Sequence, residues 1–240
     1  MKIRTIYDIL DEISPFDLQE EWDNSGLNVG DYDAKVNKIY LSLDIDEKVL
    51  ETMDENSLLI THHPLIFKSI KKVIPNRFST KLLFKIMRKN ISLIAMHTNF
   101  DKTHLNEYFA KKVLGFEGRV EDFIFYVDVD KDFDELVEYV KNKMGLKYIK
   151  TLNIKKRIKK IAITTGAGMG LLDFVRADCF LTGDIKYHEA MDAKVRGISL
   201  MDIGHYESEK YFADCLFEIL NERIDIELQK INSANPFSIK

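Results

Sequence analysis

Short apolar segments alternate with amphipathic segments along most of the chain. Runs of about four to eight residues that are apolar throughout, or that alternate apolar and polar positions, are typical of strands, and an apolar repeat near 3.6 residues is typical of helices. We expect core strands at 38–45, 57–62, 91–97, 158–165, 178–182 and 197–203. We expect helices at 46–55, 79–90, 105–115, 132–145 and 206–222, the second of them capped by Ser79 or Thr80.

This alternation of strands and helices predicts an α/β fold with mostly parallel or mixed sheets flanked by helices. We expect an N-terminal α/β half at 1–117 and a C-terminal α/β half at 155–240. Residues 118–154, where charged side chains are frequent, are predicted to form a connecting subdomain. The C-terminal half can also belong to one structural unit with residues 1–117.

The composition limits the class of protein. The chain has 240 residues, of which 45% are hydrophobic and 31% are charged, as in ordinary globular proteins. A formal net charge of −4 gives no reason to expect wholesale binding to nucleic acids or membranes. No apolar run approaches the roughly 20 residues of a membrane span. Cys179 and Cys215 lie in apolar surroundings and are expected to be reduced and buried, so we expect a cytoplasmic protein.

Most of the histidines follow predicted strands. His62 and His63 follow one strand, and three further strands are followed by "HTNFD" (97–101), "TGDIKYHEA" (182–190) and "DIGHYESE" (202–209). In open α/β sheets the ligand site forms beyond the carboxyl ends of the strands. Several nitrogen and oxygen donors that converge from separate elements are what a metal ion needs. Taken singly, Asp101 can also be a helix cap, and His205 and Glu209 a local pair at i, i+4.

Five sequence blocks resemble a known family. They are "WDNSGLNVG" (22–30), "THHPLIF" (61–67), "HTNFD" (97–101), "TGDIKYH" (182–188) and "GHYESE" (204–209). In this order they resemble the signature blocks of the NGG-interacting-factor-like family, often labelled GTP cyclohydrolase I type 2 homologues. The length of the chain matches the compact form without an inserted middle domain. The resemblance implies a ring-shaped homohexamer and a di-metal centre at which the two halves meet, with the ligands His62, His63, Asp101, His205 and Glu209.

The chemistry of this donor set is compatible with several metals. Adjacent residues in extended backbone point opposite ways, so His62 and His63 can reach two neighbouring metals. No cysteine belongs to the set, which is compatible with two divalent ions of zinc, manganese, iron, nickel or cobalt. His97, Asp184 and His188 are candidate catalytic residues that orient ligands or move protons. Alternatively, these three side chains only satisfy buried backbone groups.

The segment 68–90 is strongly basic. It contains eight Lys or Arg residues and no acid, and Lys81, Lys85 and Arg88 fall on one face of the predicted helix. Together with Lys68 they are candidates for binding an anionic small molecule such as a nucleotide. The alternative is a solvated helix face. The glycine-rich "TTGAGMG" (164–170) lacks the lysine of a phosphate-binding Walker loop.

Two classes of function remain open. The first is a metal-dependent hydrolase of a nucleotide or related phosphorylated heterocycle, in which the metals activate water. The second is a metal-containing regulatory hexamer that binds nucleic acid through its basic face and catalyses nothing.

Overall fold

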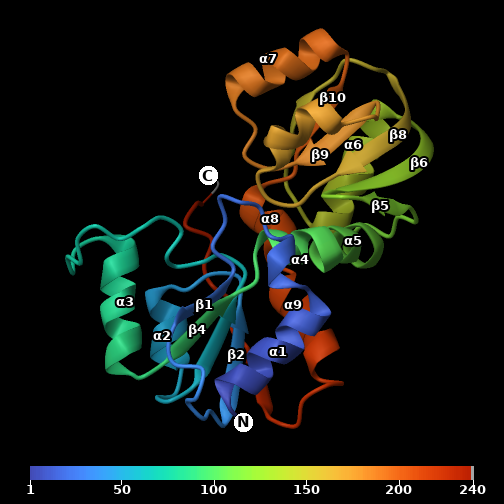
Figure 1. The fold of residues 1–240 in the computed structure, drawn as a ribbon. Coiled ribbons are helices and arrows are strands. Elements are labelled where there is room, and N and C mark those ends of the chain that lie inside the picture. The colour runs from blue at the N-terminus through green and yellow to red at the C-terminus, as the bar shows by residue number, and fades with distance from the viewer. Residues whose placement is uncertain (239–240) are drawn as a thin grey trace. The chain divides into compact units, whose positions relative to one another are not determined.

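The computed structural model describes residues 1–238, which fold into two compact α/β units (Figure 1). Unit 1 contains residues 1–100 and the described residues from 211 onward, and unit 2 contains residues 101–210. Each unit has its own mixed sheet with helices packed against it. The predicted fold class, mixed sheets flanked by helices, is therefore confirmed.

The sheet of unit 1 has three parallel strands at its centre. The strand order is β1 (Gly26–Val29), β4 (Ser92–Ala95), β3 (Leu58–Thr61), β2 (Lys38–Ser42), β11 (Glu227–Lys230). β2, β3 and β4 run parallel, with Leu41 opposite Ile60 and Ile60 opposite Ile94. β11 adds a parallel strand beside β2, and β1 pairs antiparallel with β4 at the other edge.

Helices cover both faces of this sheet (Figure 1). On one face, α2 (Glu47–Thr52) and α3 (Phe78–Arg88) bury apolar side chains such as Leu50 and Leu82 against Tyr40 of β2. On the other face lie α1 (Ile3–Ile13) and α9 (Phe212–Leu220), with the short helices η1 (Phe16–Leu18) and α4 (Thr98–Phe100) in the same unit. α3 begins at Phe78, so the expected cap at Ser79 or Thr80 is wrong. The Thr80 hydroxyl instead donates to the carbonyl of Ile74 in the preceding loop.

Unit 2 repeats the plan of three parallel central strands. Its strand order is β5 (Arg119–Glu121), β6 (Ile124–Asp132), β8 (Arg157–Ile163), β9 (Cys179–Thr182), β10 (Ser199–Asp202), β7 (Lys150–Leu152). Strands β8, β9 and β10 are parallel, and the outer strands pair antiparallel. Residues 118–154, expected to form a separate connection, supply β5, β6 and β7 to this sheet. They join it because β6 pairs with β8 from Phe125 to Asp132 and β7 pairs with β10.

The helices of unit 2, and those at its two borders with unit 1, depart from the expected ranges at two places. α7 (Tyr187–Arg196) and η4 (Gly168–Phe174) pack on one face of the sheet, and α6 (Phe133–Met144) packs against β6. Helical residues begin at Thr98 rather than near 105, and include the π-helical segments η2 (Asp101–Leu105) and η3 (Phe109–Val113) on either side of α5 (Asn106–Tyr108). The helix expected at 206–222 is divided into α8 (His205–Glu209) and α9, because the chain passes from unit 2 into unit 1 after Lys210.

Both cysteines are free and buried, as predicted. Cys179 lies in β9 and Cys215 in α9, and burial raises the pKa of both thiols. Within residues 1–238, none of the helices has the length and apolar character needed to cross a bilayer.

Candidate metal-binding groups

Unit 1 gathers histidines and a carboxylate at the carboxyl ends of its parallel strands. Asp44 follows β2, His62 and His63 follow β3, and His97 follows β4. These three strands are neighbours in the sheet, so the residues that follow them lie at one edge. One nitrogen from each of His62, His63 and His97 lies within 4.8 Å of the other two.

The adjacent histidines do not point in opposite directions. The backbone N–H groups of His62 and His63 both donate to the carbonyl of Leu43, at 3.1 and 3.2 Å. The chain is therefore no longer an extended strand at this point, and the two ring centroids lie only 5.0 Å apart. The expectation of opposed side chains is wrong for this pair, because it assumed extended backbone.

Both rings of this pair are held through Nδ1. The Nδ1 of His62 lies 2.8 Å from the carbonyl oxygen of Met96, and the Nδ1 of His63 lies 2.7 Å from a carboxylate oxygen of Asp44. Both partners are acceptors, so a neutral imidazole in this position carries its proton on Nδ1 and its lone pair on Nε2. This arrangement is typical of metal-ligating histidines, whose second nitrogen is held by a carboxylate or a carbonyl.

His97 is held in the same way by Asp23. Its Nδ1 lies 2.8 Å from the Asp23 carboxylate, which also accepts hydrogen bonds from Thr98 and from Ser25. Burial, the largest influence, raises the pKa of the Asp23 carboxyl, but the hydrogen bonds from His97 and Thr98 outweigh it and hold the pKa well below its ordinary value. Asp23 is therefore a buried anion that orients His97.

Unit 2 carries a second donor group at the corresponding edge of its own sheet. Asp184 follows β9, and His205 and Glu209 lie on α8 after β10. The Nε2 of His205 lies 2.9 Å from Glu209, and its Nδ1 lies 2.8 Å from Asp184. A carboxylate oxygen of Asp101 lies within 4.8 Å of one of Glu209. Asp101 and His205 thus each lie close to Glu209, and Asp184 orients the histidine.

The glycine-rich segment after β8 shapes this group. The Thr165 hydroxyl lies 3.4 Å from Asp101, and the next residue, Gly166, has a positive φ of 62°. A Cβ on Gly166 would lie 1.9 Å from the Glu209 carboxylate. The backbone N–H of Gly166 donates to the Ser208 hydroxyl at 3.0 Å. The segment therefore packs closely against the carboxylates, a role that sequence spacing alone did not indicate.

Two histidines lie outside these groups. His188 is exposed on α7, where its ring contacts that of Tyr187. Within residues 1–238 it joins none of the His, Asp and Glu groups close enough to share a metal, so its proposed catalytic role stays a prediction. The Nδ1 of His104 lies 2.8 Å from the Thr103 hydroxyl.

The basic face of α3 is partly neutralised. Lys81 and Lys85 both form ion pairs with Glu47 of α2, at 2.9 and 2.5 Å. Hydrogen bonds from Lys85 and Lys81 lower the pKa of Glu47 to about 2. Arg88 lies in the last turn of this helix, and Lys68 lines a pocket in the preceding loop. An anion approaching Lys81 or Lys85 would have to compete with Glu47.

The sequence did not identify three residues that orient the histidines, namely Asp23, Asp44 and Met96. Asp23 lies in the "WDNSGLNVG" block, which carried part of the family resemblance without any assigned role. Asp44 follows a predicted strand, as the candidate histidines do, and this was the signal that could have found it. Met96 acts through its backbone carbonyl, which no side-chain pattern reveals.

The fold and these groups define an α/β protein of two similar units, with clustered His, Asp and Glu side chains that could hold a metal ion. The chain belongs to the Duf34/NIF3 (NGG1p interacting factor 3) family, whose profile matches residues 1–236.

Relatives of this chain match it over nearly its whole length. A Campylobacter jejuni protein named GTP cyclohydrolase 1 type 2 homolog is 47% identical over 239 residues, covering 99% of both chains. A Helicobacter pylori (strain J99) protein named GTP cyclohydrolase 1 type 2 is 41% identical, covering 99% of this chain and 98% of its own. Among solved structures, Staphylococcus aureus hypothetical protein SA1388 superposes with a TM-score of 0.87 at 27% identity, covering 100% of this chain and 99% of its own. Reduced HcgD from Methanocaldococcus jannaschii gives 0.81 at 27% identity, covering 96% and 97%.

Proposed function

We propose that this protein is a metal-dependent hydrolase of a nucleotide or related phosphorylated heterocycle, with a di-metal centre. Its proposed ligands are His62, His63, Asp101, His205 and Glu209. The observation that carries the proposal is the hydrogen bonding of the histidines. His62, His63 and His205 are each held through Nδ1 by a carbonyl or a carboxylate. In neutral His62 and His63 this places the proton on Nδ1 and the lone pair, which can bind a metal, on Nε2. The Nε2 of His205 faces Glu209 at 2.9 Å, close enough for both side chains to bind one ion.

The proposed ligands fit divalent metals of borderline character. Imidazole nitrogens and carboxylate oxygens suit zinc, manganese, iron, nickel or cobalt, and both cysteines are buried in other elements. When bound, such ions supply Lewis acidity and lower the pKa of a coordinated water. Fewer than four protein ligands for each metal would leave positions for substrate and water, which is typical of catalytic rather than structural sites.

Two of the proposed ligands lie where the chain passes from one unit to the other. Asp101 directly follows Phe100, the last residue of the first segment of unit 1, and Glu209 precedes Phe212 of unit 1 by three residues. In unit 1, the rings of Phe100 and Phe212 lie 5.2 Å apart, and Phe212 lies 5.1 Å from His62. Both passages of the chain between the units are thus anchored beside a proposed ligand.

The remaining polar side chains have assignable roles in this proposal. Asp44 and Asp184 orient His63 and His205 through their hydrogen bonds. His97 lies with His62 and His63 and is paired with the buried anion Asp23, so it can accept a proton from a bound water or join the donor set. The naming of relatives as GTP cyclohydrolase 1 type 2 supports a nucleotide as the substrate class.

The deciding experiment combines metal analysis with a substrate screen. We expect purified protein to contain a divalent metal and to hydrolyse at least one nucleotide or phosphorylated heterocycle after reloading with that metal. A His63→Ala plus Glu209→Ala variant should lose both properties. Stoichiometric metal without turnover of any compound in the screen, together with strongly salt-dependent oligonucleotide binding, would instead support the regulatory alternative.

Assembly and compartment are part of the same proposal. The family resemblance implies a homohexamer, and the exposed apolar side chains of α3, among them Phe84 and Met87, are of the kind that oligomers bury. The two free, buried cysteines are compatible with the reducing cytoplasm in which we expect the protein to act.

A further inference from the structure

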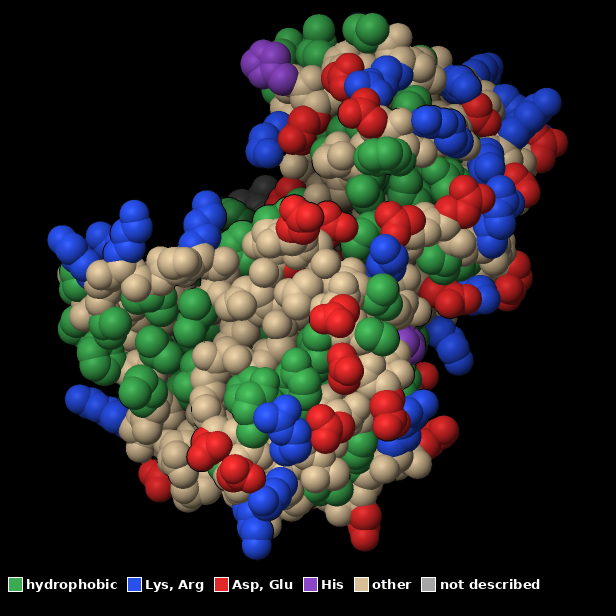
Figure 2. Space-filling model, in the orientation of Figure 1, with side chains coloured by type: hydrophobic (Ala, Val, Ile, Leu, Met, Phe, Trp, Pro, Cys, Tyr) green, Lys and Arg blue, Asp and Glu red, His purple; other side chains and the backbone are tan. Residues whose placement is uncertain are grey.

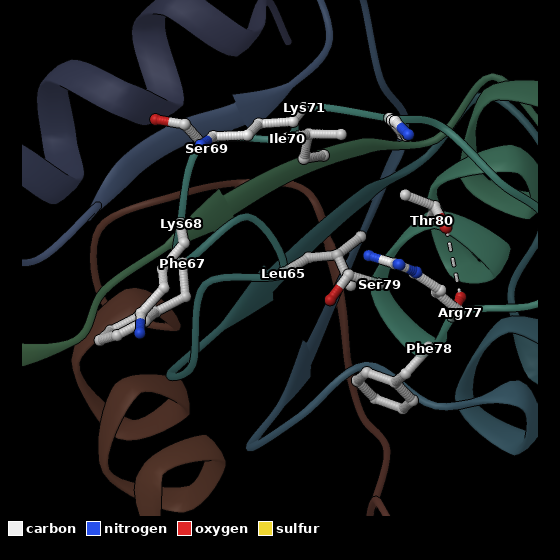
Figure 3. A pocket seen from close by; sticks show the side chains of 11 residues that line it. Leu65, Phe67, Lys68, Ser69, Ile70, Lys71, Arg77, Phe78, Ser79 and Thr80 are labelled. Carbon is white, nitrogen blue, oxygen red and sulfur yellow. Dashed lines mark hydrogen bonds between the residues drawn. The ribbon is translucent and has the colours of Figure 1, made fainter.

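A pocket of about 660 Å³ opens in the loop between β3 and α3. Four cationic side chains line it, namely Lys68, Lys71, Lys72 and Arg77, and residues 57–100 contain no acid. Figure 3 shows Leu65 at the middle of the pocket, Phe67 and Lys68 on one side, and Arg77 and Phe78 on the other. Lys and Arg side chains also gather over the loop that precedes α3 on the surface (Figure 2). The pocket is therefore both electropositive and aromatic.

Phe67 joins this pocket to the histidine group of unit 1. Its ring centroid lies 5.7 Å from that of Trp22 and 6.2 Å from that of His97. Trp22 also lies edge-on to His97, at 6.0 Å. The chain thus places two large aromatic rings, one of them on the wall of the cationic pocket, beside a proposed metal-binding or proton-accepting histidine.

The loops that bear the two aromatic rings are held in position by hydrogen bonds between side chains and backbone. The side-chain amide of Asn24 donates to the backbone carbonyl of Ile66 at 2.5 Å, which ties the loop bearing Trp22 to the residue before Phe67. The backbone N–H of His97 donates to the Ser25 hydroxyl at 3.0 Å, which fixes the same loop against β4. This arrangement exists before any ligand binds, so its formation costs the ligand little binding energy.

Exposure makes these rings available to a ligand. Trp22 is 57% exposed and Phe67 is 42% exposed, although both are large apolar side chains. Their centroid separation of 5.7 Å leaves no room for a third ring between them, so a planar ligand must lie on their outer faces. Bases stack on such faces in a sequence-tolerant manner, and cationic side chains bind phosphate oxygens.

We propose that Trp22 and Phe67 form a stacking platform for the base of a nucleoside phosphate, whose phosphate groups are bound by Lys68, Lys71, Lys72 and Arg77. This assignment places the base edge beside His97. It rests on the proposed function for the reaction that follows, but the binding itself requires no turnover. The proposed phosphate-binding residues do not include Lys81 and Lys85, whose charges are offset by Glu47.

The single tryptophan of the chain gives a direct test on the metal-loaded full-length protein. We expect GTP to quench Trp22 fluorescence saturably. Guanosine and inorganic tripolyphosphate each carry half of the recognised chemistry, so both should bind more weakly than GTP, and only guanosine should quench by stacking. Equal affinity for GTP and tripolyphosphate would overturn the stacking platform.

Variants measured by calorimetry separate the two halves of the site. Phe67→Ala should weaken GTP binding by about 5- to 150-fold, the range for loss of one stacking partner, and leave tripolyphosphate binding unchanged. Lys71→Gln plus Lys72→Gln plus Arg77→Gln should weaken both ligands. Phe174→Ala, at another exposed aromatic, and Lys147→Gln, at another exposed lysine, are the matched controls. The inference fails if the pocket variants behave like these controls.

Chelator-treated protein distinguishes this inference from the proposed function. If GTP binds with the same variant pattern but no metal-loaded sample turns over any nucleotide, the result supports the stacking platform and contradicts the proposed hydrolase. If nucleotides are hydrolysed with KM unchanged in Phe67→Ala and in the triple variant, the result supports the hydrolase and contradicts the stacking platform. Trp22→Phe keeps an aromatic ring and should retain GTP affinity within a few-fold, which checks that loss of binding reflects lost stacking rather than misfolding.

Discussion

The carboxylate of Glu209 occupies the space that a side chain on Gly166 would need. A Cβ at Gly166 would lie 1.9 Å from Oε1 of Glu209, and Gly166 has a φ of 62°, a conformation in which glycine is strongly favoured. Glu209 itself is buried, with His205 2.9 Å away. The turn after β8 can therefore pack against the proposed ligand Glu209 on α8 only because Gly166 has no side chain.

Gly166→Ala should therefore displace Glu209. We expect a loss of about 1–2 kcal/mol in the free energy of unfolding from backbone strain, together with weaker metal binding. Gly170→Ala is the matched control, because it lies in the same glycine-rich segment, where nothing lies within 4 Å of an added Cβ. Chemical unfolding and metal analysis check both variants. Equal metal content in the two would show that Glu209 tolerates the displacement.

Removal of proposed ligands should lower the bound metal directly. His62→Ala, His63→Ala and Glu209→Ala each delete one donor and should reduce metal content, measured by elemental analysis of protein at known concentration. His104→Ala should leave it unchanged, because the ring of His104 is engaged by Thr103 instead. Full occupancy in the His63→Ala plus Glu209→Ala double variant is incompatible with the proposed ligand set.

Removal of a carboxylate that orients a ligand should lower the affinity for the metal but not the number of metal ions bound at saturation. Asp44→Ala deletes the acceptor 2.7 Å from Nδ1 of His63 but leaves the ring in place. We expect the metal to bind about 10- to 100-fold more weakly, with the same stoichiometry at saturation. Competition with a chromogenic chelator measures the change. Glu51→Ala, at an exposed carboxylate on α2, should bind metal as the wild type does.

The sequence predicted the central strands well because their apolar runs are unambiguous. β3 and β4 are buried along their whole length, and their ends position His62, His63 and His97 as expected. The edge strands β1 and β11 were missed, since their short and partly exposed sequences have no such run. Their place depends on pairing with strands far away in the chain.

Only the donor residues of the site were predictable from the sequence. Strand-end position pointed to the histidines, but a carbonyl such as that of Met96, or a carboxylate 74 residues away such as Asp23 for His97, becomes visible only in three dimensions. The division into units was missed for a similar reason. The chain returns to unit 1 at Tyr211 in the middle of an amphipathic stretch that the sequence pattern shows as one helix.

Assembly is testable without any variant. We expect light scattering coupled to size exclusion to give a mass several times the 28.0 kDa of one chain, as the proposed homohexamer requires. The mass should hold on dilution through the micromolar range, since obligate oligomers bury large apolar surfaces. A monomer at these concentrations contradicts the homohexamer but not the metal-binding prediction, because all the proposed ligands belong to one chain.

Acid should weaken unit 2 through Asp178, which lies away from the metal-binding groups. Its carboxylate accepts hydrogen bonds from the side chain of Lys155 at 2.5 Å and from the backbone N–H groups of Lys159 and Lys160 at 2.8 and 3.1 Å. Burial, the largest influence, raises the pKa of Asp178, but these hydrogen bonds outweigh it and lower the pKa below its ordinary value. Below about pH 4 the unfolded chain therefore binds a proton more readily than the folded one.

The lowered pKa of Asp178 in the folded protein determines how stability changes with pH. The contribution of Asp178 to stability is fully present above the unfolded pKa and is lost as the pH falls through the lowered folded value. Asp178→Asn should cost about 1–2 kcal/mol at neutral pH, from the loss of charged hydrogen bonds, and the difference from wild type should shrink as the pH falls below about 4. Denaturant unfolding at several pH values measures it, with Asp8→Asn, at an exposed carboxylate on α1, as the control. A difference that stays constant from neutral to acid pH would mean that Asp178 stabilises the fold by packing rather than by its charge.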